Sequence, residues 1–261
     1  IFSFVVPDDK DRIELRSLCR LFRDALKPPP LYTIFPHPNY PTLDGLVDSL
    51  NNVYQTNPNK APKIMFVMKG TFHGNNSSVN INYPLIMIGA GQNKTFLSGY
   101  SVCIGGTQEE GKRVVLKDMT ITSNKWGLFG MNGLSFLCDS MTFTRCGISG
   151  VYAQNTKGRL INCVITQCEQ SGIYCDPNAV IELEGDQTKV DGNNIGGYSD
   201  WYGLQTYDTS SIIHLLFPLT KQSVSTNNHG GGNYGGNGEI AIVDNDGNII
   251  EIINEAHEYD Y

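Results

Sequence analysis

The sequence has little positive charge and no long apolar segment. Lys and Arg number 19 against 26 Asp and Glu, which gives a formal net charge of -7 and a pI near 5.2. Binding to nucleic acid or to acidic lipids draws on clustered Lys and Arg, and a membrane helix needs about 18 consecutive apolar residues. We therefore expect neither nucleic acid nor a membrane as a partner.

The sequence also lacks the short motifs of cofactor and metal sites. Its five histidines do not have the spacing of metal ligands, and it contains no phosphate-binding loop or nucleophile elbow. Gly89 and Gly91 are not followed by the rest of a dinucleotide-binding pattern, so they indicate a turn. The seven cysteines form an odd count, which favours reduced core thiols and an intracellular protein. No metal and no cofactor are expected.

What the sequence does contain is a repeat. One column is made of threonines at intervals of 22 residues, with the last member 32 residues on: Thr122, Thr144, Thr166, Thr188 and Thr220. A second column is made of glycines followed by apolar residues: Gly127, Gly150, Gly172 and Gly203. A third follows these glycines after five or six residues: Asn132, Asn155, Asn178 and Asp208. Such columns at a fixed period are typical of a solenoid.

The repeat predicts a right-handed parallel β-helix over residues 63–254, with coils of about 22 residues. The segments around the threonines alternate in polarity and are rich in β-branched residues, which favours strands over helices. Strands that recur in one direction pair in parallel, about 4.8 Å apart, so equivalent side chains stack. Ile121, Phe143 and Ile165 would then point inward, and the asparagines would occupy turns with left-handed backbone angles. Cys146, Cys168 and Val190 would stack as small buried side chains.

The residues ahead of the repeat predict a cap. Residues 42–54 begin with Thr42, a good N-cap, and place Leu43, Leu46, Val47 and Leu50 on one helical face. A solenoid needs such an element to cover the end of its core. We expect residues 41–62 to form a capping helix and linker, and residues 255–261 to form an acidic tail.

The first coils carry a resemblance that agrees with the repeat. Residues 64–72 read IMFVMKGTF and residues 84–99 read PLIMIGAGQNKTFLSG. Both segments resemble the opening coils of pectin-methylesterase-like and pectate-lyase-like β-helices, which often carry the pattern G-x-Y/F, then I-x-G-x-G, then T-x-I-x-G. The resemblance implies the pectate-lyase-like fold.

The first 40 residues have a different character and form a helical leader. Leu15, Leu18, Cys19, Phe22 and Leu26 lie on one face of an amphipathic helix that Pro28 ends. Together with the opening Ile1, Phe2 and Phe4 and the closing Pro30, Leu31 and Tyr32, this pattern resembles an F-box, although Tyr32 stands where an F-box has Trp. The other interpretation of the leader is a helix that packs on the β-helix.

The two resemblances together imply a function. A leader of the F-box type followed by a β-helix resembles the substrate adapters of ubiquitin ligases. The resemblance implies that a Skp1-like protein binds Leu15, Leu18, Cys19, Phe22, Leu26, Leu31 and Tyr32 of the leader, and that the β-helix recognises a protein substrate. A fold by itself does not fix a function, and a structural or self-associating solenoid is a further alternative.

Parallel β-helices also include polysaccharide lyases, hydrolases and epimerases, whose chemistry needs particular side chains. Such enzymes use carboxylates across a groove, or a carboxylate cluster with a basic residue. Asp118 and Asp139 lie about one coil apart, and Lys157 and Arg159 follow in the next coil. These four residues are the candidate catalytic set of a carbohydrate-active alternative. The other interpretation is that they are solvated charges beside strands.

The last candidate is an insertion that carries aromatic residues. The interval from Thr188 to Thr220 exceeds the period by 10 residues and contains residues 191–202. Insertions in a solenoid project from one face, and exposed aromatic residues often anchor proteins or sugars. Trp126, Trp201, Tyr202 and Tyr207 are therefore predicted to form a ligand-binding patch, with a packed loop that binds nothing as the alternative.

Overall fold

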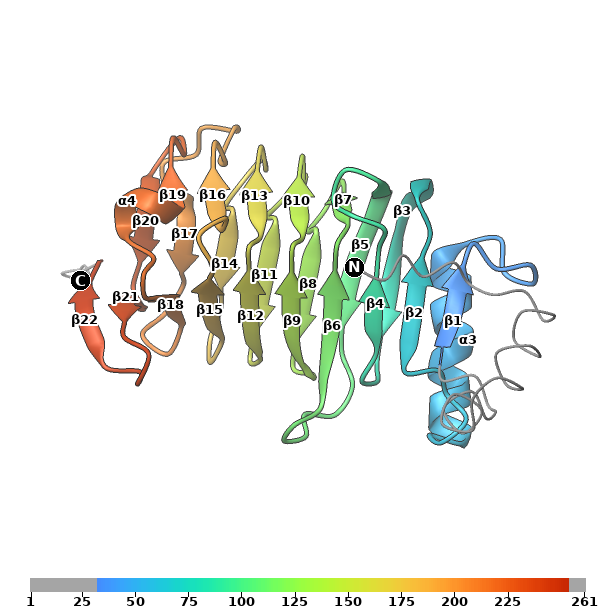
Figure 1. Cartoon of the computed structure of the whole chain (residues 1–261). Helices are drawn as coiled ribbons and strands as arrows, with labels where there is room; N and C mark the ends of the chain where they lie inside the picture. The colour runs from blue at the N-terminus through green and yellow to red at the C-terminus, as the bar shows by residue number, and fades with distance from the viewer. Residues whose placement is uncertain (1–31, 254–261) are drawn as a thin grey trace.

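The computed structural model describes residues 32–253, which form an elongated stack of parallel strands with a helix at one end (Figure 1). The predicted leader residues Leu15, Leu18, Cys19, Phe22, Leu26 and Leu31, and the predicted tail, lie outside the described residues. Within them, α3 (Leu43–Thr56) and α4 (Lys221–Val224) are the helices, and neither is long and apolar enough to cross a membrane.

The strands of residues 32–253 form two sheets, and every strand pair among them is parallel except β21–β22. The ten-stranded sheet has the order β1 (Tyr32–Phe35), β2 (Ile64–Val67), β4 (Ile86–Ile88), β6 (Arg113–Lys117), β9 (Ser135–Asp139), β12 (Lys157–Ile161), β15 (Val180–Glu184), β18 (Ile212–Leu216), β21 (Glu239–Val243) and β22 (Ile249–Ile252).

The second sheet has two arms that meet at β5 (Thr95–Ile104), with which β3 (Gly70–Ile81) also pairs. The threonine arm consists of β7 (Thr120–Thr122), β10 (Thr142–Thr144), β13 (Val164–Thr166), β16 (Lys189–Asp191) and β19 (Ser225–Thr226). The aromatic arm consists of β8 (Leu128–Met131), β11 (Val151–Gln154), β14 (Ile173–Cys175), β17 (Tyr202–Thr206) and β20 (Gly232–Gly236).

The predicted right-handed parallel β-helix is confirmed, and so is its period in the central coils. Val114 of β6 pairs with Phe136 of β9, which pairs with Gly158 of β12, so each step is 22 residues. The period lengthens where a coil carries a longer loop, as between Ile181 and its partner Ile213. The chain makes about eight turns of roughly 24 residues on average.

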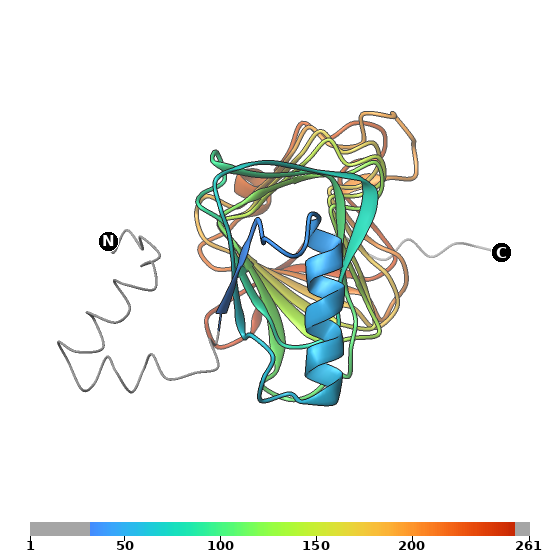
Figure 2. The same cartoon turned by 90° about the vertical axis from the view of Figure 1, so that its right-hand side faces the viewer.

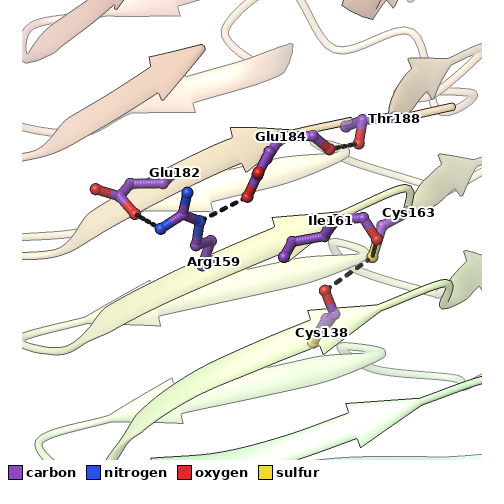
Figure 3. A network of polar contacts seen from close by, with 7 residues as sticks. All are labelled: Cys138, Arg159, Ile161, Cys163, Glu182, Glu184 and Thr188. Carbon is purple, nitrogen blue, oxygen red and sulfur yellow. Dashed lines mark hydrogen bonds and ion pairs between the residues drawn. The ribbon is translucent and has the colours of Figure 1, made fainter. Parts of the chain in front are cut away.

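The threonine column is correct for three coils and wrong beyond them. Thr166 pairs with Thr144 on one side and with Asp191 on the other, so Asp191 takes the place predicted for Thr188. Thr188 is buried, and its hydroxyl donates to the carbonyl of Glu184 (Figure 3). Thr220 is the N-cap of α4. A turn at Gly185, where φ is 83°, lengthens this coil and shifts the register, which a fixed interval does not reveal.

The core confirms the residues predicted to point inward, but the predicted stack of Val190 on Cys168 is wrong. Ile121, Phe143 and Ile165 are fully buried and pair in register through β7, β10 and β13. Val190 pairs with Ile165 rather than stacking on Cys168. The residue beside Cys168 in the next coil is Asn193, whose Oδ1 accepts from the Cys168 amide at 3.1 Å. The described cysteines are free thiols, and all of them except Cys103 are buried.

The asparagine column lies at turns, as predicted. Asn132, Asn155 and Asn178 have φ of 51°, 46° and 58°, the left-handed region that Asn tolerates better than most residues. The Asn155 side-chain amide donates to Asn132 Oδ1 at 2.9 Å, which joins two successive coils. Stacked turns therefore reinforce the parallel pairing of the strands.

The capping helix lies across the N-terminal end of the stack, where Figure 2 looks down the coils. Thr42 Oγ1 accepts from the Gly45 amide at 3.3 Å, and the predicted face of Leu43, Leu46, Val47 and Leu50 is buried. The β-helix begins earlier than residue 63, because β1 precedes the cap and pairs in parallel with β2. Tyr32, assigned to the leader, is thus the first residue of the sheet and contacts the ring of Phe66.

Candidate functional site

The carboxylates of the predicted catalytic set lie near Lys117. Lys117 pairs in register with Asp139, and its Nζ is 2.6 Å from Asp139 Oδ2. Asp118 follows β6 in a left-handed turn with φ of 57°. Burial raises the pKa of the Asp118 carboxyl; Lys117 lowers it in part, and Asp139 adds to the rise. Asp139 is thus already engaged by a lysine of the neighbouring strand.

The basic members of the predicted set, Lys157 and Arg159, lie on β12. Neither forms a hydrogen bond or an ion pair with Asp118 or Asp139. Arg159 Nε lies 2.9 Å from Glu184 Oε2, and its Nη1 lies 3.6 Å from Glu182 Oε2 (Figure 3). Lys157 is exposed at the start of β12. Of the four predicted residues, Asp139 and Arg159 are therefore held in separate ion pairs, and Asp118 and Lys157 form no ion pair within residues 32–253. Between residues 32 and 253 there is also no cluster of His, Cys, Asp and Glu that fits a metal ion.

The aromatic patch is larger than predicted and forms a ladder on the aromatic arm. Phe129, Tyr152 and Tyr174 occupy one register column, with centroid distances of 4.9 Å and 5.5 Å between successive rings. Trp126 contacts Phe129 at 4.6 Å, and Trp201 and Tyr207 contact Tyr174 at 5.3 Å and 6.3 Å. The three column residues were missed, although each is the second residue after a glycine of the repeat.

The ladder is mainly a stacked structure. Its successive rings are nearly parallel, at 19° and 26°, so they cover one another's faces and turn their edges outward. Tyr207, 57% exposed, is the open ring at the end of the ladder. The predicted Tyr202 is not in ring contact with the ladder; its ring lies over Gly231 and Gly235, where an added Cβ would come within 2.7 Å and 2.3 Å of ring carbons.

A carboxylate fixes the middle of the ladder. The Tyr152 hydroxyl donates to Asp176 Oδ2. Burial raises the pKa of Tyr152, and the hydrogen bond to Asp176 raises it further. Burial also raises the pKa of Tyr174, with a smaller contribution from Asp176. Both tyrosines therefore stay neutral near pH 7, and their hydroxyls act as hydrogen-bonding groups rather than as bases.

The threonine arm borders a groove that sequence reasoning missed. It consists of two adjoining hollows of about 570 and 680 Å³ that share Ser123, Asn124 and Arg145. The smaller hollow is completed by Cys146, Gly147, Gln167, Glu169 and Ile195. The larger is completed by Thr71, His73, Asn75, Asn76, Phe96, Ser98, Gly99 and Thr122. The groove therefore runs across successive coils.

Two departures from the regular coil bound this groove. At one end, residues 74–76 of β3 bulge out opposite Gly99, with φ of 47° at Asn75 and 66° at Asn76. At the other end, Ile195 belongs to the insertion that follows β16 and is 50% exposed. Asn194 holds this insertion, because its side chain donates to the carbonyls of Tyr198, Trp201 and His229. The predicted insertion thus contributes Ile195 to one end of the groove.

Comparison with known proteins agrees with this architecture. A family model described as a right-handed beta helix region matches residues 69–217, which is more than half of the chain. The chain belongs to this family. No curated protein and no solved structure matches it. In this right-handed β-helix protein the matched range includes the whole aromatic ladder and the whole groove, while α3 lies ahead of it.

Proposed function

We propose that the β-helix is a protein-recognition module and that the chain acts as a substrate adapter of a Skp1-type ubiquitin ligase. The observation that carries the recognition part is the groove along the threonine arm. Its two ends are a bulge at Asn75 and Asn76 and Ile195 of an insertion, more than one hundred residues apart in sequence, which the coiling brings to one side of the molecule. Insertions on one face of a solenoid often form its binding face.

The chemistry of the described residues favours binding over catalysis. Two members of the predicted catalytic set are held in separate ion pairs, Asp139 with Lys117 and Arg159 with Glu182 and Glu184. Glycoside hydrolysis needs two carboxyl groups facing one bond, and a lyase of the β-helix type needs a free basic residue beside a cation site. Ion pairs occupy the Asp139 carboxylate and the Arg159 guanidinium, which are one of the two candidate carboxylates and one of the two candidate bases. The carbohydrate-active alternative therefore gains no support from this set.

The adapter part rests on the leader pattern. The spacing of Leu15, Leu18, Cys19, Phe22 and Leu26 in the sequence predicts an apolar helix face of the kind that a Skp1-like protein binds in F-box proteins. Tyr32 is left out of the proposed contact, because it belongs to β1 and pairs there with Ile64 of β2.

A capture experiment tests the adapter. The full chain is immobilised and exposed to a purified Skp1-type protein, beside the variant Leu18→Asp with Phe22→Asp and the control Arg16→Ser on the opposite helix face. We expect the wild type and the control to retain the Skp1-type protein and the double variant to lose it. Absence of capture by the wild type would remove the adapter from the proposal.

A further inference from the structure

The groove has an uneven charge distribution. In the larger hollow the charged or titratable lining residues are Arg145 and His73, and no carboxylate of residues 32–253 lines it. The one carboxylate among the lining residues of the whole groove is Glu169, in the smaller hollow toward Ile195. A protein with a net charge of -7 thus has a hollow of about 680 Å³ lined by hydroxyls, amides, one imidazole, one phenyl ring and one guanidinium.

Arg145 is available at the centre of this groove. It is exposed and lines both hollows. Its Nε donates to Gln167 Oε1 at 3.3 Å, and it forms no ion pair within residues 32–253. Arg159, in contrast, is held by two glutamates. The terminal nitrogens of Arg145 are therefore free to donate to an anionic group, and guanidinium donors bind carboxylate and phosphate in a bidentate manner.

Arg145 has a left-handed backbone conformation that is unfavourable for an arginine. Arg145, Gln167, Gly192 and Asn227 hold the equivalent turn position in four coils, with φ of 52°, 57°, 62° and 52°. Gly and Asn adopt this left-handed region easily, whereas other residues lose about 1–2 kcal/mol. The two coils that carry the less suitable Arg and Gln are those whose turns line the groove.

The length and lining of the groove fit an extended peptide. His73 lies in β3, and Gln167 directly follows β13. The sheet order from one to the other is β3, β5, β7, β10 and β13, so four strand spacings, or about 19 Å, separate these two strands. An extended chain covers this span with about six residues. The lining side chains are mostly hydroxyls and amides, which bond main-chain groups, and the stacked rings lie on the other arm.

We infer that the groove binds an extended peptide that presents an acidic or phosphorylated side chain to Arg145 in the larger hollow, on the side away from Glu169. The inference rests on the protein-recognition part of the proposed function and names the class of peptide. Carboxylate and phosphate are both anionic groups that a guanidinium can bind in a bidentate manner. The experiment distinguishes them by comparing glutamate with phosphoserine peptides.

The test uses eight-residue peptide libraries with one fixed central residue, either phosphoserine, glutamate, serine or lysine, and measures retention by the immobilised full chain. We expect retention of the phosphoserine or the glutamate library at least tenfold above the serine and lysine libraries. Arg145→Asn should abolish this preference, because Asn suits the turn but carries no charge. Arg145→Lys should keep part of it, and Arg113→Gln, on the other sheet, should leave it unchanged. Unfolding curves of all variants check that each is folded.

Several results would overturn the inference. They are equal retention of all four libraries, a preference for lysine, and an unchanged preference in folded Arg145→Asn. A failure of the adapter is separate. If the Skp1-type protein is not captured while the anionic libraries are retained through Arg145, the ligase role is lost and the peptide site stands. Capture of the Skp1-type protein with no peptide retained means that the groove inference fails and the leader contact stands.

Discussion

At the scale of single residues, the turns decide where the chain departs from a uniform strand. Residues with φ between 46° and 66° recur between strands and are mostly asparagines, such as Asn132, Asn155 and Asn178. The amide side chain stabilises its own left-handed backbone and also bonds the neighbouring coil, as Asn155 does with Asn132. Each such turn thus links local conformation to the stacking of coils.

Substitution at Asn155 separates these two contributions. Asn155→Gly removes the hydrogen bond to Asn132 but keeps a residue that accepts φ of 46°, whereas Asn155→Ala loses both. We expect Ala to lower the free energy of unfolding by about 2 kcal/mol and Gly to lower it by about 1 kcal/mol. Urea unfolding measures both values, with Asn59→Ala as an exposed control. Equal losses for Ala and Gly would show that the backbone conformation contributes nothing.

Asp118 allows a test of pH dependence. Burial, offset in part by Lys117, raises the pKa of its carboxyl above the ordinary 3.8, so the folded state holds its proton more strongly than the unfolded state does. The free energy of unfolding therefore falls as the pH rises from below 3.8 through the raised value. Asp118→Asn removes this loss and suits the left-handed turn. We expect its melting temperature to exceed that of the wild type at about pH 7 and to match it near pH 3.

The control for this prediction is Asp139→Asn. Asp139 is paired with Lys117 at 2.6 Å, so its loss should lower the melting temperature at neutral pH rather than raise it. An Asp118→Asn variant that is less stable than the wild type at pH 7 would contradict the prediction.

At the scale of elements, the cap was the most predictable part of the molecule. The 3.6-residue period of Leu43, Leu46, Val47 and Leu50 is a local signal, and the structure buries that face against the first coils. The strands were predictable wherever the interval was constant. The prediction for Thr188 was wrong because a turn at Gly185 adds residues to its coil. A column that is defined by a constant interval does not reveal such an addition.

The groove was not predicted because it is built from segments that are far apart in the sequence. Asn75 and Ile195 lie at its two ends, and nothing in the sequence near either residue indicates that the coiling places both on one side. The insertion itself was visible as an excess length, so one wall could be anticipated. Arg145 gave no signal, because only the register shows that Gly192 and Asn227 occupy the equivalent positions in later coils.

A substitution in the cap tests its contribution to stability. Leu46 is 1% exposed on the buried face of α3, and Asp48 is exposed on the other side of the same helix. Leu46→Ala should lower the free energy of unfolding by about 2–5 kcal/mol through lost burial and a cavity, whereas Asp48→Ala should change it by less than about 0.5 kcal/mol. Urea unfolding provides the values. Similar small changes for both variants would show that the cap is not packed on the core.

At the scale of the whole molecule, the β-helix is a one-dimensional stack in which each coil contacts mainly its neighbours. The strand pairs connect consecutive coils, as β10 does with β7 and β13. In such a stack the stability is close to a sum over coils and the interfaces between them. A defect in one coil should therefore weaken the adjacent coils first and distant coils less, which is a property of the architecture rather than of any single contact.

Phe143 is the residue with which to test this property. It is fully buried in the middle of the stack, between Ile121 and Ile165, whereas Phe217 is 58% exposed near the C-terminal coils. Phe143→Ala should cost about 3–5 kcal/mol, and Phe217→Ala should cost much less. Hydrogen exchange of Phe143→Ala should show the largest loss of amide protection in β7, β10 and β13, and a decreasing loss toward β2 and β21. A uniform loss along all coils would mean that the molecule opens as one cooperative unit, and the nearest-neighbour description would then be wrong.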